Sequence, residues 1–140
     1  MGCHHQRFNH FKFAQKCYEQ SLRIYKVTTG SEHQCVAQVL HNIGIIYHSL
    51  GNNAIALKCF NTSLSIRLLQ LNERDISLAD SYCWIGKIHR EEKRFSKAHE
   101  NFVAAHQIKV AILGAGHIES AEVLQNIGIV CDDLGLCSQR

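Results

Sequence analysis

The sequence predicts an all-α protein, a solenoid of antiparallel helix pairs with about five helices. The first observation behind this prediction is a repeat. The segment 36–51 returns as 120–135, and a weaker third copy, 78–93, lies midway between them. A period of 42 residues is typical of helical repeat arrays. The third copy shares its positions with the other two, as in the sets Ala37, Ala79 and Ala121; Ile43, Ile85 and Ile127; Gly44, Gly86 and Gly128.

Two further observations support helices throughout the chain. Apolar residues recur at three- and four-residue steps in every segment of the repeat, and no alternation of strand period competes with them. The 140 residues contain no proline. Proline inside a helix costs about 3 kcal/mol, so its absence suits long, uninterrupted helices.

The repeat divides the chain into half a repeat, two whole repeats and the first helix of another. We expect a frayed segment at 1–10, because no clear helical pattern covers it. The remaining elements are a helix at 11–28, a repeat of two helices over 34–70, a second repeat over 76–112, a last helix at 119–134 and a tail at 136–140.

Polar residues and glycines mark the ends of these helices. Ser31 and Gln34 form a potential capping box before the first repeat, and Asp75 is a candidate N-cap of the second. Within the repeats, Gly51-Asn52 and Lys93-Arg94 make the turns, and the glycine-rich segment 113–117 precedes the last helix.

The buried stripes follow from helical spacing. In the first repeat we expect Val36, Leu40, Ile43, Tyr47, Leu50, Ala56, Leu57, Phe60, Ser63, Leu64 and Ile66 to face the core; in the second, Ala79, Tyr82, Ile85, Ile88, Ala98, Phe102, Ala105 and Ile108.

Charge and composition exclude several classes of protein. The formal net charge is only +3, with about +3 over residues 1–34 and about −3 over 119–140, so no basic arm for nucleic acid is expected. The longest apolar runs are too short to span a membrane. Seven cysteines without a Cys-x-x-Cys pair or a signal peptide indicate free thiols, and hence a cytoplasmic protein.

The pattern does not predict an enzyme, a cofactor or a metal site. Cysteines and histidines scatter over the predicted helix faces without a recurrent nucleophile–base pairing, and each repeat glycine lies inside a helix or ends one. Cys3, His4, His5 and His10 match no standard zinc spacing, and His99 and His106 are too far apart along one helix for a two-ligand clip.

The repeat resembles the tetratricopeptide repeat. Small residues stand at 37, 44 and 56, large ones at 40, 43, 47 and 60, and a glycine turn follows at 51. That family's usual period is about 34 residues. The longer period here is similar to the variety in kinesin light chains, whose helix-opening pattern Val36-Ala37-x-x-Leu40-x-Asn42-Ile43-Gly44-x-x-Tyr47 matches. Leu113-Gly114-x-Gly116-His117 resembles its inter-repeat loop, with Ile118 in place of the usual proline.

The resemblance covers roughly residues 11–135. It implies a right-handed α-solenoid whose concave face binds an extended peptide or a partner protein. The first helix of each pair lines the groove in that family, and asparagines there hold the ligand backbone. Asn42 and Asn126 occupy the matching positions, whereas the middle repeat has Trp84.

Further groove candidates on the same helices are His41, His48, Lys87 and Arg90. The middle helix offers cations and an aromatic, and the last helix carboxylates. A groove of mixed sign would favour a ligand with both acidic and basic residues, or an acidic-aromatic one centred on Lys87, Arg90 and Trp84. A purely structural interpretation remains open for each: the asparagines could satisfy groups at helix contacts, Trp84 could pack between helices, and the cations could be solvated.

Two other functions remain open. The chain could be the recognition part of a larger signalling ATPase or enzyme, or a self-associating structural module. Helix 119–134 has an apolar stripe, Val123, Leu124, Ile127 and Val130, but no following helix to cover it. We expect a longer array in preference to pairing with another copy.

Overall fold

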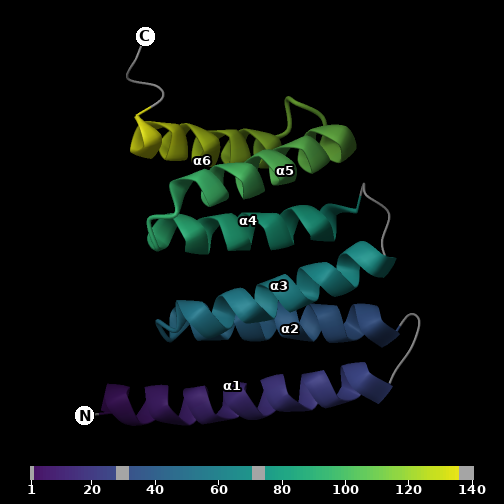
Figure 1. The fold of residues 1–140 in the computed structure, drawn as a ribbon, viewed down its shortest axis with the longest axis vertical. Helices are drawn as coiled ribbons and strands as arrows, with labels where there is room; N and C mark the ends of the chain where they lie inside the picture. The colour runs from purple at the N-terminus through teal and green to yellow at the C-terminus, as the bar shows by residue number, and fades with distance from the viewer. Residues whose placement is uncertain (1, 28–31, 71–74, 136–140) are drawn as a thin grey trace. The chain divides into compact units, whose positions relative to one another are not determined.

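The computed structural model contains six helices and no strand among residues 2–27, 32–70 and 75–135, whose backbone the structure describes; side chains are described for 12–27, 33–69 and 75–135. The helices are α1 (Gly2–Val27), α2 (Glu32–Ser49), α3 (Asn53–Gln70), α4 (Ile76–Glu91), α5 (Phe95–Leu113) and α6 (Ile118–Leu134) (Figure 1). The all-helical prediction is confirmed, with six described helices where about five were expected.

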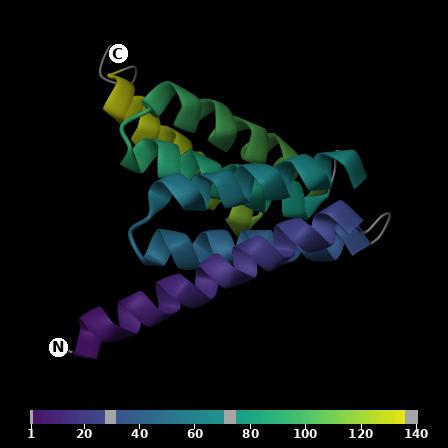
Figure 2. The same cartoon turned by 60° about the horizontal axis from the view of Figure 1, so that its bottom comes forward.

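The chain forms two compact units, Met1–Gln70 and Leu71–Arg140. The N-terminal unit holds α1, α2 and α3, and the C-terminal unit holds α4, α5 and α6 (Figures 1 and 2). Within each unit, successive helices run antiparallel and pack against each other. Both units therefore contain a complete helix pair, α2–α3 or α4–α5, and one additional helix.

The first helix is longer than the sequence suggested. α1 begins at Gly2, so most of the segment 1–10, which we expected to be frayed, belongs to the helix. Residues 3–10 contain neither proline nor glycine, so nothing in their composition breaks a helix even though they give no amphipathic pattern. Ser31, half of the predicted capping box, and the tail 136–140 lie outside the described residues.

Polar side chains cap two helices of the C-terminal unit, α4 and α6. The predicted N-cap of α4 is confirmed, because Asp75 Oδ1 accepts a hydrogen bond of 2.8 Å from the Ser77 backbone N–H. At α6, the N-cap is His117, whose Nδ1 accepts from the Glu119 backbone N–H at 3.1 Å. This second cap was not anticipated; it lies in the loop that the glycines had marked.

One backbone feature recurs with the period of the repeat. Gly51, Lys93 and Gly135 follow the first helix of their pair, and their φ angles are +83°, +63° and +76°. Such left-handed conformations favour glycine, because a Cβ atom is sterically unfavourable there. Lys93 is the only non-glycine residue with positive φ in the described part of the chain, so the turn between α4 and α5 is strained.

The core of the N-terminal unit lies between α2 and α3. Leu40, Tyr47 and Phe60 are fully buried, as the helical spacing predicted. A methyl group on Gly44 would lie 3.0 Å from the Phe60 ring, so the glycine allows the ring to approach α2 closely. Ser63 Oγ donates a 2.6 Å hydrogen bond to the Ala37 carbonyl oxygen, which fixes the register of the pair.

The C-terminal unit repeats this packing. Its core cluster contains Ala79 from α4, Ala98, Phe102 and Ala105 from α5, and Val123 and Val130 from α6. A methyl group on Gly86 would lie 3.2 Å from the Phe102 ring, the same contact that Gly44 makes with Phe60. The ring of Phe102 consequently lies deep against α4, at the base of the site described next.

Candidate functional site

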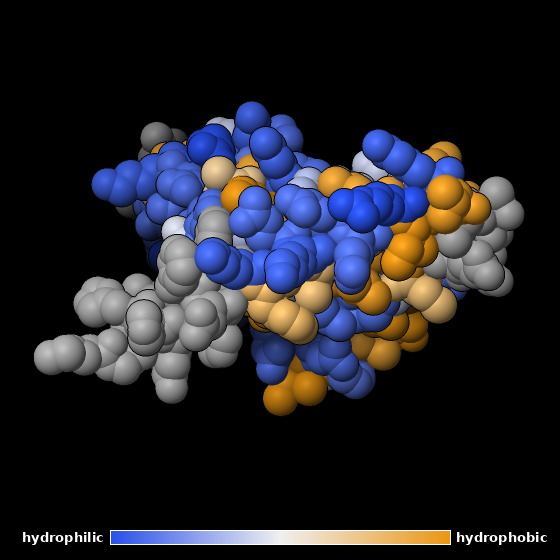
Figure 3. Space-filling view, turned by 90° about the horizontal axis from the view of Figure 1, so that it is seen from below, coloured by the Kyte–Doolittle hydropathy of each residue, from blue (hydrophilic) through white to orange (hydrophobic). Residues whose placement is uncertain are grey.

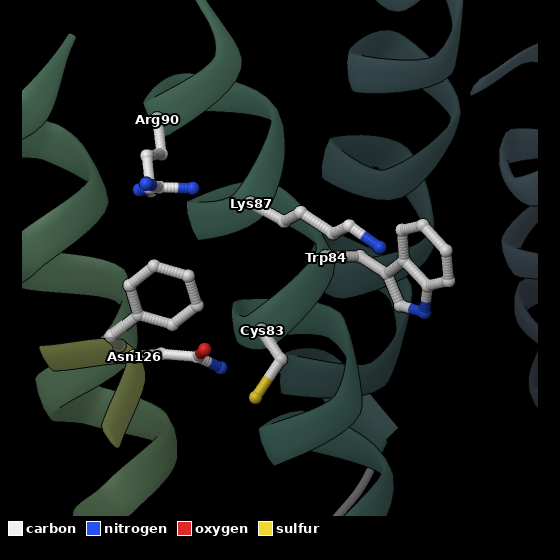
Figure 4. A pocket seen from close by; sticks show the side chains of 6 residues that line it. Cys83, Trp84, Lys87, Arg90 and Asn126 are labelled. Carbon is white, nitrogen blue, oxygen red and sulfur yellow. The ribbon is translucent and has the colours of Figure 1, made fainter. Parts of the chain in front are cut away.

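The C-terminal unit contains a pocket of about 250 Å³ lined by side chains from all three of its helices. Its lining residues are Cys83, Trp84, Lys87 and Arg90 from α4, Phe102 from α5 and Asn126 from α6 (Figure 4). Residues 83, 87 and 90 lie on one face of α4 because they are spaced by one turn each. The pocket therefore lies between the first helices of two successive repeats, with the second helix beneath them.

The base of the pocket is apolar. Phe102 is only 3% exposed, and Cys83 is half-buried. Burial raises the pKa of the Cys83 thiol to about 11, with Lys109 opposing this rise and Asp80 adding to it. The thiol is therefore protonated at neutral pH, and it contributes a polarisable apolar surface and not a thiolate.

The rim of the pocket carries two cations with different surroundings. Lys87 Nζ lies 4.8 Å from the centroid of the Trp84 ring, a cation–π contact. Arg90 Nε lies 3.0 Å from Asp133 Oδ2, so this ion pair connects α4 to the C-terminal turn of α6. In Figure 4, Arg90, Cys83 and Asn126 point into the same space, whereas the Lys87 amine extends toward Trp84.

The structure brings four of the predicted site residues together: Trp84, Lys87, Arg90 and Asn126. Sequence reasoning missed Cys83 and Phe102. The helical spacing of Cys83 with Lys87 and Arg90 was a signal that could have identified it. Phe102 was expected only in the core, where it also lies, and nothing in the sequence shows that its ring borders a pocket.

The other three predicted residues lie on α2 in the N-terminal unit. Asn42 is exposed, and its Oδ1 accepts a 3.1 Å hydrogen bond from Gln38 Nε2. Gln38 Oε1 accepts in turn from Arg67 Nη2 at 2.9 Å. This chain of contacts orients the Asn42 side chain on the surface of α2. His48, one turn and a half further on, is half-buried.

His41 lies in the core and not on the surface where a partner would touch it. It is 7% exposed, and its ring meets the Phe60 ring edge-on, with centroids 5.2 Å apart and planes at 71°. Its Nδ1 is buried without a hydrogen-bond partner in the described structure. Burial, and to a lesser extent Arg67, lower the pKa of His41 to about 4, so the ring is neutral at physiological pH.

These groups suit recognition: an aromatic face, two cations, an amide and an apolar base around one opening. Among the described residues, no three His, Cys, Asp or Glu side chains gather in a way that would hold a metal ion. No described helix is both long enough and apolar enough to cross a membrane.

Comparison with known proteins gives one family. A search of curated proteins finds no match for the chain. The model of the tetratricopeptide repeat family matches residues 3–68, which is nearly all of α1, α2 and α3. Residues 76–113 repeat the sequence pattern and the glycine–phenylalanine contact of that matched segment. The matched segment is therefore similar to the tetratricopeptide repeat, and the fold of the chain is all-helical, as expected of such repeats.

Proposed function

We propose that this chain is a protein–protein interaction scaffold of the kinesin-light-chain-like variety, and that the pocket of the C-terminal unit holds part of an extended peptide. Tetratricopeptide repeats generally mediate protein–protein interaction. The observation that carries the proposal is that Trp84, Lys87, Arg90 and Asn126 line one pocket together with the ring of Phe102.

The chemistry of the opening specifies the ligand. Arg90 and Lys87 attract carboxylates, and the guanidinium nitrogens of Arg90 other than Nε remain available beside Asp133. Phe102 and Cys83 offer an apolar base for one side chain of the ligand. Asn126 presents both a donor and an acceptor, as a peptide backbone requires. An acidic peptide with an aromatic residue therefore fits this site.

On α2, we assign Asn42 the same role that Asn126 has on α6, with His48 nearby. The right-handed solenoid with a concave binding face, which the resemblance implies, stays part of this proposal. His41 is not part of the proposed site, because its ring is buried against Phe60.

Trp84 provides the assay, because it is the only tryptophan of the chain. We would titrate the full chain with peptides that contain Asp, Glu and Phe but no Trp, and follow the Trp84 fluorescence. The control peptides replace each acid by its amide. Arg90→Gln or Lys87→Gln should weaken binding by about tenfold, since hydrogen bonds to charged groups contribute at least this much. Asn126→Ala should weaken it by about fivefold.

Lys58→Gln is the matched control, because Lys58 is an exposed lysine of α3 outside the pocket. Its affinity should equal that of the wild type. If the acidic and amide peptides bind equally, or if the pocket variants bind like the Lys58 variant, the pocket is not the binding site.

A further inference from the structure

The charges around the pocket of the C-terminal unit do not balance. Lys87 and Arg90 are the charged residues among the side chains that line it. Asp133 Oδ2, on α6, lies 3.0 Å from Nε of Arg90, so this carboxylate offsets one of the two cations. Lys87 contacts the uncharged Trp84 ring. Two cations and one anion therefore give the opening a net charge of +1.

One of the two cations is directed into the pocket. In Figure 4, the Arg90 guanidinium points into the space that Cys83 and Asn126 also face, whereas the Lys87 amine extends toward Trp84. An anionic group of a ligand in this space would therefore contact Arg90. Asp133 already accepts from Nε, and the two outer nitrogens form a planar fork that matches the two oxygens of one carboxylate.

This arrangement places the ligand anion close to Asp133. Both anions then lie one hydrogen bond, about 2.9 Å, from the same guanidinium. A carboxylate of Asp or Glu carries one negative charge, which matches the net charge of the opening. A phosphate monoester carries about −1.5 to −2 at pH 7. Its additional charge is left without a cation and is repelled by Asp133.

We propose that Asp133 is a specificity-determining residue of the pocket. It restricts the ligand to a peptide whose anchoring acid is a carboxylate, and it disfavours a peptide that carries a phosphate at the same position. This inference rests on the proposed function, because it requires that the pocket binds an acidic peptide. It adds that phosphorylation of a serine in the ligand does not replace the glutamate or aspartate that the pocket selects.

The experiment compares three peptides on the full chain, with Trp84 fluorescence as the readout. The peptides contain Phe and no Trp, and they differ only at the anchoring position, which is Glu, phosphoserine or Gln. Asp133→Asn removes the charge but keeps an oxygen that can accept from Arg90. Asp132→Asn is the matched control, because this exposed neighbour loses the same charge from another face of α6, about 100° around the helix.

A second control concerns α1, whose surface can also attract acidic peptides. Figure 3, seen from below Figure 1, shows a mostly hydrophilic surface interrupted by hydrophobic side chains. The exposed cations of α1 include Lys16 and Lys26. Arg90→Gln separates the two sites, because it removes the contact in the pocket and leaves α1 unchanged. Binding that persists in this variant is subtracted from the affinities of the other forms.

At low ionic strength, we expect the wild type to bind the Glu peptide about threefold more tightly than the phosphoserine peptide. Asp133→Asn should raise the affinity for the phosphoserine peptide about tenfold and for the Glu peptide about threefold, because the repulsion that is removed scales with the charge of the ligand. The preference should then disappear. Asp132→Asn should behave as the wild type. At about pH 5, phosphoserine is mostly a monoanion, and the wild type should bind both peptides equally.

Two results would overturn this inference and leave the proposed function intact. One is a wild type that binds the phosphoserine peptide at least as tightly as the Glu peptide at pH 7. The other is an Asp133→Asn variant whose ratio of the two affinities equals that of Asp132→Asn. If the wild type instead binds the Glu and Gln peptides equally, the pocket does not select an acid, and the proposed function fails as well. Far-UV circular dichroism confirms that each variant is folded.

Discussion

The three repeat-equivalent glycines allow the packing to be tested with one substitution made three times. Gly44→Ala, Gly86→Ala and Gly128→Ala each place a methyl group on the first helix of a pair. Alanine is favoured over glycine inside a helix by about 1 kcal/mol, and this gain applies to all three variants. Any difference between them must come from what the methyl group meets.

The surroundings of the three positions differ strongly. At Gly44 the methyl group would lie 3.0–3.1 Å from three atoms of the Phe60 ring, and at Gly86 about 3.2 Å from three atoms of the Phe102 ring. Phe60 is fully buried, so its ring has no room to move, whereas the Phe102 ring borders the pocket and can shift toward it. Overpacking of this kind costs about 1–3 kcal/mol. At Gly128 no atom lies within 4 Å.

We therefore expect Gly44→Ala to be destabilised by about 1–2 kcal/mol and Gly86→Ala by about 0–1 kcal/mol after the gain in helix propensity is subtracted. Gly128→Ala should be stabilised by about 0.5–1 kcal/mol. The measurement is urea unfolding followed by circular dichroism, at a concentration where the chain does not associate. If Gly44→Ala were as stable as Gly128→Ala, the ring would not be seated on the glycine, and the close helix contact described above would be wrong.

Three further predictions concern single side chains. Lys93→Gly should stabilise the chain by about 1 kcal/mol in urea unfolding, because Lys93 adopts the left-handed conformation that glycine has at the equivalent turns; a loss of stability would contradict this strain. The folded-state pKa of His41, about 4, lies below its usual 6.5, so the unfolded chain binds a proton first as the pH falls. Stability should therefore be lost between about pH 6.5 and 4, on the order of 2–3 kcal/mol, and His41→Leu should abolish this part of the loss; equal pH profiles would refute it. Asp75→Ala should lower the free energy of unfolding by about 1 kcal/mol, because α4 loses its cap, whereas Asp75→Asn should retain most of the stability that the cap provides. Equal melting temperatures of the two variants would argue against capping.

The period of the sequence was sufficient to predict the helices and the core. Spacing identified Leu40, Phe60 and Phe102 as buried, and the cap at Asp75 followed from the residue type. The start of α1 could not be predicted in this way, because a segment rich in polar residues has no apolar stripe to indicate a helix. The sequence led to four of the six residues that line the pocket, but only the packing of Phe102 against α4 showed that it is a pocket.

The burial of His41 is a second feature that spacing in the sequence could not predict. It follows Leu40 in the sequence, and a position beside a buried one on a helix is as often exposed as covered. The Phe60 ring of the neighbouring helix decides the outcome, and sequence spacing does not specify where that ring lies. The contact between Arg90 and Asp133 is similar, since it joins residues on two different helices. An aspartate near the C-terminus of a helix opposes the helix dipole, and nothing in the sequence indicates that Asp133 has a partner on α4.

The ion pair between Arg90 and Asp133 affects how Arg90 would bind an acidic ligand. The side chain is 44% exposed, and an isolated arginine there would sample many rotamers. Asp133 contacts only Nε of Arg90, so the guanidinium is oriented before a ligand binds. Its two outer nitrogens do not contact that carboxylate. Binding of a ligand carboxylate would then cost less conformational entropy of the Arg90 side chain. Asp133 would orient Arg90 for the ligand and would not compete with it.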